Sequence, residues 1–330
     1  MRNYCTYFDS TFIVRGLTLY RSLVEESAAF NLWVLCLDEM TFDTLTLLDA
    51  PGLLPIRLAE LESAYPELQN VKAHSGRADY FFYYLPSLPA YILEREPAIR
   101  TITFLDADLY FFSDPDTILN EMTGNSVLIL EHRFPSALQN IRKFGRFKIG
   151  FLGFRNDEGG RGFLENWRSQ WKDWCTLRVR DEKCADQAYL DEWPARFNGA
   201  NMVQHLGANV SPWNVGRYDV QHASDRVTVN GIELIFYHFH QLRILNRWLC
   251  DPGLVHFQKT PATRELREWV YKPYLRALSD TWDWMGDHTD GLNPGYVQVQ
   301  PGRYTFGNLF QDTLRSFIRG QLLVSMRGFR

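Results

Sequence analysis

Hydrophobic residues along the N-terminal part of the chain alternate between two spacings. Mainly apolar runs at residues 4–8, 32–37 and 54–58 have the length of buried β-strands. Between these runs, apolar residues recur about every 3.6 positions at 13–24 and 41–48, which is the period of a helix that packs one face on a core. This order of strands and helices is typical of a parallel sheet flanked by helices. We therefore predict an α/β fold that binds its ligand at the carboxyl ends of the strands.

The central part of the chain continues this pattern. It predicts strands at 101–112, 126–130 and 147–154, and helices at 80–93, 115–122, 167–174 and 186–193. Pro86 and Pro89 lie within the first of these helices, so we expect a break or kink there. Asp38 directly follows a predicted strand, and we interpret it as the N-cap of the helix at 41–48 in preference to a catalytic group.

Beyond about residue 250 the pattern becomes helical, so we expect one domain over residues 1–250 and a helical C-terminal region over 251–330. A basic amphipathic helix is predicted near the C-terminus, and it can lie on an anionic membrane surface or dock on the parent domain. The sequence leaves both interpretations open. Its apolar face carries Leu309, Phe310, Leu314, Phe317, Ile318 and Leu322, and its basic residues are Arg315, Arg319, Arg327 and Arg330.

Composition narrows the class of protein. With 330 residues, 45% of them hydrophobic, the chain is long enough to bury a large core. A net charge of −4 gives no electrostatic reason to expect nucleic-acid binding. The five cysteines include no Cys-x-x-Cys pair, which argues against a zinc site and for a reducing compartment. We find no apolar signal segment and no run of transmembrane length, so we expect a cytoplasmic protein.

Two carboxylates mark the end of the apolar strand that begins at Thr101. Asp106 and Asp108 are one residue apart, so their side chains share one face of an extended strand. Like charges placed together repel each other, and a hard divalent cation such as Mg²⁺ or Mn²⁺ removes that repulsion by binding both. The alternative is a solvated strand-to-loop turn. The cost of burying unpaired charge makes the metal site the stronger interpretation.

A second segment offers further ligands for such a cation. The apolar run from Leu234 ends with His238 and His240 on one face, and Arg243 follows. Histidine is a frequent ligand of ions like Mn²⁺, and arginine can hold phosphate oxygens with two hydrogen bonds. A cation between carboxylates and a nucleotide diphosphate would neutralise the charge that develops on the leaving group. This combination indicates a transferase that uses a nucleotide-sugar donor.

An ordered series of segments supports this interpretation, although the Asp-x-Asp motif alone is weak. The segments are 5–9, 75–79, 105–115, 147–150, 186–190, 205–209 with 213–214, and 238–243. Through them the chain resembles metal-dependent glycosyltransferases of the GT-A fold over roughly residues 4–245. The resemblance is to the retaining group that includes glycogenin and bacterial lipooligosaccharide galactosyltransferases, and still more to a related set of uncharacterised bacterial sugar transferases.

The resemblance implies a Rossmann-like fold that transfers a hexose, with retention, from a UDP-linked donor to a glycan or lipid-linked acceptor. It implies that Asp106, Asp108 and His238 bind Mn²⁺ or Mg²⁺. Asp186 and Gln187 match a catalytic pair that lies beside the transferred sugar. The residues that the resemblance places at the nucleotide sugar are Thr6, Tyr7, Asp9, Arg77, Asp106, Asn209 and Arg243.

The chain departs from the related enzymes at two positions. Lys148 stands where they usually carry asparagine, and Gln241 replaces a glycine after the histidine. The first departure changes a contact to the donor sugar, and the second changes the phosphate loop. The role of Asp186 has three interpretations that the sequence leaves open: a nucleophile, a group that orients sugar hydroxyls, or a helix N-cap.

Two other functions fit parts of the pattern. Phosphotransferases and phosphatases with Asp-x-Asp after a strand usually carry the motif near the N-terminus, followed by threonine or valine, whereas here Leu109 follows at mid-chain. A non-catalytic carbohydrate-binding protein of the same fold would keep the aromatic residues. It would not need to retain metal-binding and phosphate-binding groups together. Both functions are kept as alternatives.

Overall fold

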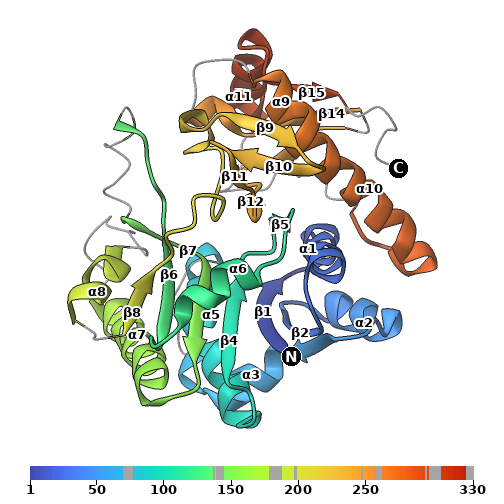
Figure 1. Cartoon of the computed structure of the whole chain (residues 1–330). Coiled ribbons are helices and arrows are strands. Elements are labelled where there is room, and N and C mark those ends of the chain that lie inside the picture. The colour runs from blue at the N-terminus through green and yellow to red at the C-terminus, as the bar shows by residue number, and fades with distance from the viewer. Residues whose placement is uncertain are drawn as a thin grey trace.

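A computed structural model gives the structure of the protein (Figure 1). It describes residues 1–69, 77–136, 138, 145–177, 188–196, 199–246, 248–257, 262–293, 296 and 306–324.

A central sheet of seven strands organises the fold. The strand order is β3-β2-β1-β4-β7-β6-β8. β3, β2, β1 and β4 run parallel, β7 is antiparallel to β4 and β6, and β8 is parallel to β6. The strands are β1 (Arg2–Phe8), β2 (Phe30–Cys36), β3 (Leu53–Arg57), β4 (Thr101–Leu105), β6 (Val127–Glu131), β7 (Phe147–Arg155) and β8 (Ala200–Met202). The predicted alternation of strands and helices over the first 60 residues is therefore confirmed.

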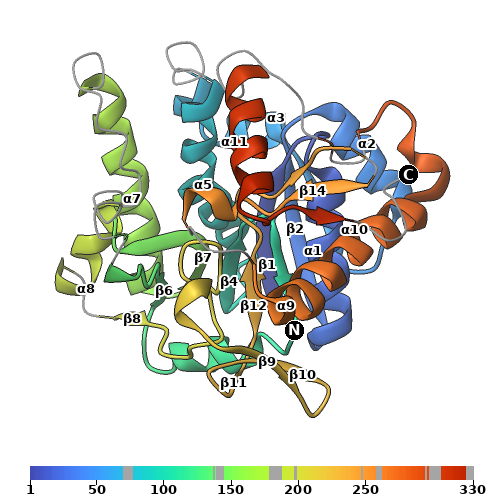
Figure 2. The ribbon, with the colours of Figure 1, turned by 90° about the horizontal axis from the view of Figure 1, so that it is seen from above.

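Helices cover both faces of this sheet, because the side chains of each strand alternate between two cores. Tyr4 and Phe8 of β1 belong to one core cluster, and Cys5 belongs to the other. In Figure 2 helices α3, α5 and α7 lie on one side of the sheet, with α9 and α10 on the other. The helices are α1 (Ile13–Glu26), α2 (Glu39–Leu48), α3 (Leu58–Ala64), α5 (Arg77–Arg95), α6 (Asp116–Leu119), α7 (Glu158–Leu177), α8 (Trp193–Arg196), α9 (Arg264–Leu266), α10 (Lys272–Met285) and α11 (Phe306–Ile318).

Three small sheets stand beside the central one. β5 (Leu109–Phe111) pairs with β12 (Phe236–His238), and this pairing joins two segments that are far apart in the sequence. β9 (Val220–Ala223), β10 (Arg226–Val229) and β11 (Ile232–Glu233) form an antiparallel meander. β13 (Arg243–Ile244), β14 (Leu249–Asp251) and β15 (Leu323–Val324) form the third sheet.

The C-terminal segment packs on the N-terminal one. Thr18 of α1 donates a hydrogen bond from its hydroxyl to that of Thr281 on α10, at 2.9 Å. Tyr271 and Tyr274 at the start of α10 are fully buried in the same core cluster as α1. Among the described residues, no helix combines the length and the apolar character that a membrane crossing requires.

Two predictions about local structure have definite outcomes. Asp38 is the N-cap of α2, because its carboxylate accepts a hydrogen bond from the backbone N–H of Thr41 at 2.8 Å. Of the break or kink expected at Pro86 and Pro89, the break is wrong, because both prolines lie inside a continuous α5, and the kink stays a prediction. Tyr84 and Leu88 on this helix are fully buried, so tertiary packing offsets the hydrogen bonds that the prolines remove.

Candidate functional site

The two aspartates lie in a tight turn between β4 and β5. The backbone N–H of Asp106 donates to the carbonyl of Gly150 at 2.9 Å, and Leu109 N–H donates back to the carbonyl of Asp106 at 3.2 Å. The segment is thus a turn at positions 106–108 and not the extended strand that we predicted. The turn nevertheless directs both carboxylates toward the same partner, His238.

The pairing of β5 with β12 brings this partner into place. His238 is opposite Leu109 in the strand register, and Phe239 N–H donates to the carbonyl of Asp108 at 2.9 Å. The His238 Nε2 atom lies 2.9 Å from Asp108 Oδ1 and 3.7 Å from Asp106 Oδ2. The predicted proximity of Asp106, Asp108 and His238 is therefore seen in the structure.

His240 completes a cluster that can hold a metal ion. Asp108, His238 and His240 each offer one ligand atom, and these three atoms lie within 4.8 Å of one another. One carboxylate oxygen and two imidazole nitrogens suit ions such as Mn²⁺. The donor set therefore fits a divalent cation. The sequence pattern offered His240 together with His238 as a possible ligand, whereas the resemblance assigned only His238 to the metal.

The pKa values of Asp108 and His240 are shifted toward the forms that bind a cation. Burial alone would raise the pKa of Asp108, but the charge and hydrogen bond of His238 outweigh it and lower the pKa well below its usual value. Burial, followed by the positive charges of His238 and Lys148, lowers the pKa of His240 to about 3. At neutral pH the carboxylate is thus charged and the His240 imidazole neutral, which is the form that binds a metal.

Lys148 brings a positive charge to the same site. Its Nζ atom lies 3.2 Å from Asp106 Oδ2, and its side chain is only 11% exposed. The ammonium also lies 5.9 Å from the centre of the Trp213 ring. Asp106 Oδ2 therefore lies near both Lys148 and His238, whereas Asp108 lies beside the two histidines. The sequence marked Lys148 as a departure from the related enzymes, and the structure shows which carboxylate it contacts.

An aromatic wall supports the cluster from behind. The Trp213 ring contacts the rings of His238 and His240 edge to face, at 5.3 and 5.5 Å between centroids. Trp213 and Asn214 both donate to the carbonyl of His132, each at 2.9 Å. Burial, followed by the charge of Lys148, lowers the pKa of His132 to about 3, so this ring is neutral as well. We did not predict His132 as a site residue. Its position directly after β6, at the end of a predicted strand, was the signal that could have pointed to it.

Three predicted nucleotide-binding residues lie at the carboxyl end of β1, beside that of β4. Thr6 is fully buried, and its hydroxyl lacks a hydrogen-bond partner among the described residues. The Tyr7 ring packs on Phe104 at 5.6 Å. Asp9 accepts a hydrogen bond from the backbone N–H of Thr11 at 3.0 Å. This is the edge of the sheet where α/β proteins bind ligands.

Asn209 and Arg243 are buried and hold local structure. Asn209 is 2% exposed, and its side-chain amide donates to the carbonyl of Glu131 at 2.8 Å. Arg243 is 3% exposed, ion-paired with Asp251 and 3.3 Å from Asp312. The guanidinium predicted to contact the diphosphate thus already contacts two carboxylates. Its role in donor binding stays a prediction.

Three predicted residues have side chains that the structure does not describe. Asp186 and Gln187 are outside the described residues. Arg77 is the first residue of α5, and its side chain is not among those described. The predicted roles of these three residues therefore stay predictions.

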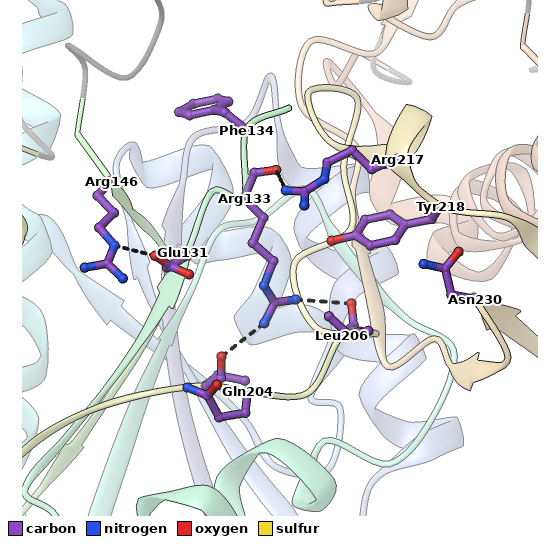
Figure 3. A pocket seen from close by; sticks show the side chains of 10 residues that line it. Glu131, Arg133, Phe134, Arg146, Gln204, Leu206, Arg217, Tyr218 and Asn230 are labelled. Carbon is purple, nitrogen blue, oxygen red and sulfur yellow. Dashed lines mark hydrogen bonds and ion pairs between the residues drawn. The ribbon is translucent and has the colours of Figure 1, made fainter. Parts of the chain in front are cut away.

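A cavity of about 530 Å³ lies next to this site, between the end of β6 and the loop that follows β8 (Figure 3). Figure 3 shows Arg146 and Glu131 on one side of it and Arg217 and Tyr218 on the other. The Phe134 ring stacks on the ring of His132 at 4.6 Å, and this contact joins the wall of the cavity to the aromatic wall behind the cluster. None of the sequence patterns pointed to this cavity.

Comparison with known proteins supports the fold. No protein-family model matches the chain. The chain is 27% identical to the uncharacterized protein YfnD of Bacillus subtilis, over 89% of its own length and 96% of YfnD. It is 28% identical to YfnF of the same organism, over 74% of its length and 82% of YfnF.

Among solved structures, an active-site mutant of LgtC aligns with 84% of this chain and 95% of its own, with a TM-score of 0.52 and 13% identity. A second structure, of the galactosyltransferase LgtC in complex with donor and acceptor sugar analogues, covers 83% of this chain and 94% of its own, with 14% identity and a TM-score of 0.48. The order of the strands and the alignment with the LgtC mutant confirm the predicted Rossmann-like α/β architecture. The chain has the GT-A glycosyltransferase fold.

Proposed function

We propose that this protein is a metal-dependent glycosyltransferase that moves a hexose from a nucleotide-diphosphate sugar, with UDP as the nucleotide, to a glycan or lipid-linked acceptor. The observation that carries the proposal is the cluster of Asp108, His238 and His240 beside Asp106, at the carboxyl end of β4 in this fold. Anionic, cation-binding groups at the ligand-binding edge of the sheet suit a donor that carries a diphosphate.

Each residue has a proposed task in this reaction. Asp106, Asp108 and His238, with His240, would hold Mn²⁺ or Mg²⁺, which supplies positive charge for the departing diphosphate. Lys148 is close enough to Asp106 to contribute further positive charge. We propose Thr6, Tyr7, Asp9, Arg77, Asn209 and Arg243 as donor-binding residues, and Asp186 and Gln187 as the catalytic pair beside the sugar. Retention of configuration is part of the proposal.

A panel of nucleotide sugars tests the proposal. In a thermal-shift screen with the full chain, at least one donor should raise the unfolding temperature with Mn²⁺ and not with EDTA, because a ligand of the native state adds to its stability. Slow hydrolysis of the same donor should accompany binding. A donor that binds equally well with EDTA would contradict the metal-dependent mechanism. If the protein bound free sugars but none of the nucleotide sugars, the non-catalytic alternative would be favoured. Cleavage of a phosphate ester would favour the phosphotransferase.

We further propose that α11 attaches the protein to an anionic membrane surface on its cytoplasmic side. Helix α11 docks on the domain through its polar residues, because Asp312 contacts Arg243 and Ser316 donates to Asp251 at 3.0 Å. Its large apolar side chains consequently point outward. Phe310, Leu314, Phe317 and Ile318 are 60%, 45%, 68% and 73% exposed, and Arg315 lies beside them. An exposed apolar face with flanking arginine suits a lipid surface that carries negative charge.

Replacing Phe310 and Phe317 together by serine should weaken the affinity for phosphatidylglycerol vesicles, measured by co-sedimentation, by about 100- to 1,000-fold, since each buried phenylalanine contributes roughly 2 kcal/mol. The matched control is Leu47→Ser on α2, a side chain that is 66% exposed on another helix. Vesicle binding that survives the double substitution, or a full-length protein that ignores anionic vesicles, would contradict the attachment.

A further inference from the structure

The cavity beside the metal-binding cluster has an unusual charge. Its lining includes three arginines, Arg133, Arg146 and Arg217, and a single carboxylate, that of Glu131. Arg146 pairs with Glu131, so two positive charges are left over. Among the described residues, neither Arg133 nor Arg217 has a carboxylate within ion-pair distance. A cavity of about 530 Å³ is large enough for a sugar residue, and this one would attract an anion.

Hydrogen bonds to backbone carbonyls hold two of these arginines in place. Arg133 donates to the carbonyls of Val203, Leu206 and Ala208 at 3.0 to 3.2 Å. Arg217 donates through Nη1 to the carbonyl of Arg133 at 2.9 Å (Figure 3). Carbonyl acceptors fix a guanidinium without cancelling its charge. Both groups are therefore positioned before any ligand arrives, which lowers the entropic cost of binding.

The backbone at the cavity is held in an unfavourable conformation. Arg133, which follows β6 in the wall of the cavity, has a φ of +52°. Residues other than glycine rarely adopt this left-handed conformation, and residues held in it cluster at binding sites. At Arg133 this conformation sets the direction in which the chain leaves β6 and enters the cavity wall.

A chain of aromatic contacts links the wall of the cavity to the proposed donor site. From Phe134 the aromatic contacts run through His132 to Trp213, at 5.4 Å, and from there to the histidines of the cluster. Arg146 immediately precedes β7, two residues before Lys148, whose ammonium contacts Asp106. The Cα atoms of two such residues are roughly 7 Å apart, so the same stretch of chain contributes to the wall of the cavity and to the aspartate site.

We propose that this cavity is the acceptor subsite, and that it takes a sugar residue carrying a carboxylate or a phosphate. The acceptor role rests on the proposed transferase function, whereas the binding of an anionic sugar does not. Arg217 is the specificity-determining residue, because it is exposed and only its Nη1 is engaged among the described residues. A guanidinium can hold a carboxylate or a phosphate through two parallel hydrogen bonds. The rings of Phe134 and Tyr218 supply apolar surface for the sugar ring.

Calorimetric titration of the full chain without nucleotide and with EDTA tests the subsite. Methyl β-glucuronide and glucose 6-phosphate serve as the carboxylate and phosphate probes, and methyl β-glucoside is the neutral control. At least one anionic probe should bind about tenfold more tightly than the glucoside, and added salt should weaken it. The stronger of the two identifies which anion the subsite prefers. Equal affinity for all three probes would overturn the proposal.

Arg217→Gln should remove most of the preference for the anionic probe, and Arg217→Lys should restore part of it, because lysine keeps the charge but not the paired donors. The matched control is Arg276→Gln, an exposed arginine on α10. An Arg217→Gln protein that keeps the preference would overturn the assignment of this residue. Failure of the transferase function would appear separately, as the loss of any Mn²⁺-dependent donor binding, because the two titrations share no ligand.

Discussion

Replacing Asp108 by asparagine is expected to abolish Mn²⁺-dependent donor binding. Asp108 is the one carboxylate in the cluster of three described groups that could hold a metal ion, and its Oδ1 atom lies 2.9 Å from His238 Nε2. Asparagine has the same shape but lacks the negative charge that a hard cation requires. We expect Mn²⁺ affinity to fall by more than about 100-fold, since even residues that only orient metal ligands change affinity by roughly 10- to 100-fold. Titration calorimetry with Mn²⁺ measures this directly.

The neighbouring aspartate provides an internal comparison. Asp106 is 3.7 Å from His238 Nε2 and shares its Oδ2 atom with Lys148, so Asp106→Asn should reduce Mn²⁺ affinity less than Asp108→Asn. The control is Asp43→Asn, an exposed carboxylate on α2. An Asp108→Asn protein that binds Mn²⁺ as the parent does would show that the cation, if it binds, is held elsewhere.

The local sequence was enough to predict the architecture because each element carries its own signal. The mainly apolar runs at 4–8 and 32–37 mark β1 and β2, and Asp38 caps the next helix through a hydrogen bond to a residue three positions away. The break expected at Pro86 and Pro89 does not occur, and the reason is the opposite one. Proline is a strong local signal, but the buried face of α5 is stabilised by contacts with other elements, which local patterns do not contain.

The candidate site was predictable in its residue types but not in its connections. Asp106, Asp108 and His238 come together through the β5–β12 register, and the same register brings in His240. Arg243 shows what residue types alone leave out. A cation after two histidines suggests a phosphate ligand, yet its partners Asp251 and Asp312 come from a different strand and from α11. Such long-range ion pairs leave no mark on the local pattern.

The C-terminal helix was predictable as amphipathic, but its orientation was not. The sequence allowed an apolar face on the domain or on a membrane. In the structure Asp312 and Ser316 form the inner face, because buried Arg243 and Asp251 offer partners for polar groups there. A network of polar residues thus decides which face of α11 is exposed, and only the fold reveals it.

Replacing Gly150 by alanine is expected to disable the same site without unfolding the protein. A Cβ atom at this position would lie 2.5 Å from Asp106 Oδ2 and 3.1 Å from the Cε atom of Lys148. Both atoms are at the ends of side chains, so they can move aside at small cost to the fold. The carboxylate of Asp106 would turn away from His238. We expect Mn²⁺-dependent donor turnover to fall about 10- to 100-fold, the range seen when metal ligands lose their orientation.

Gly162→Ala is the matched control, because a Cβ at this position in α7 meets no atom of the described residues within 4 Å. This control should keep its turnover and gain up to roughly 1 kcal/mol in the free energy of unfolding, since alanine favours a helix over glycine. Thermal unfolding and donor hydrolysis, measured on both variants, separate the two effects. If Gly150→Ala kept full turnover, the position of Asp106 would not matter to the reaction, and Asp108 with the two histidines would have to bind the cation without it.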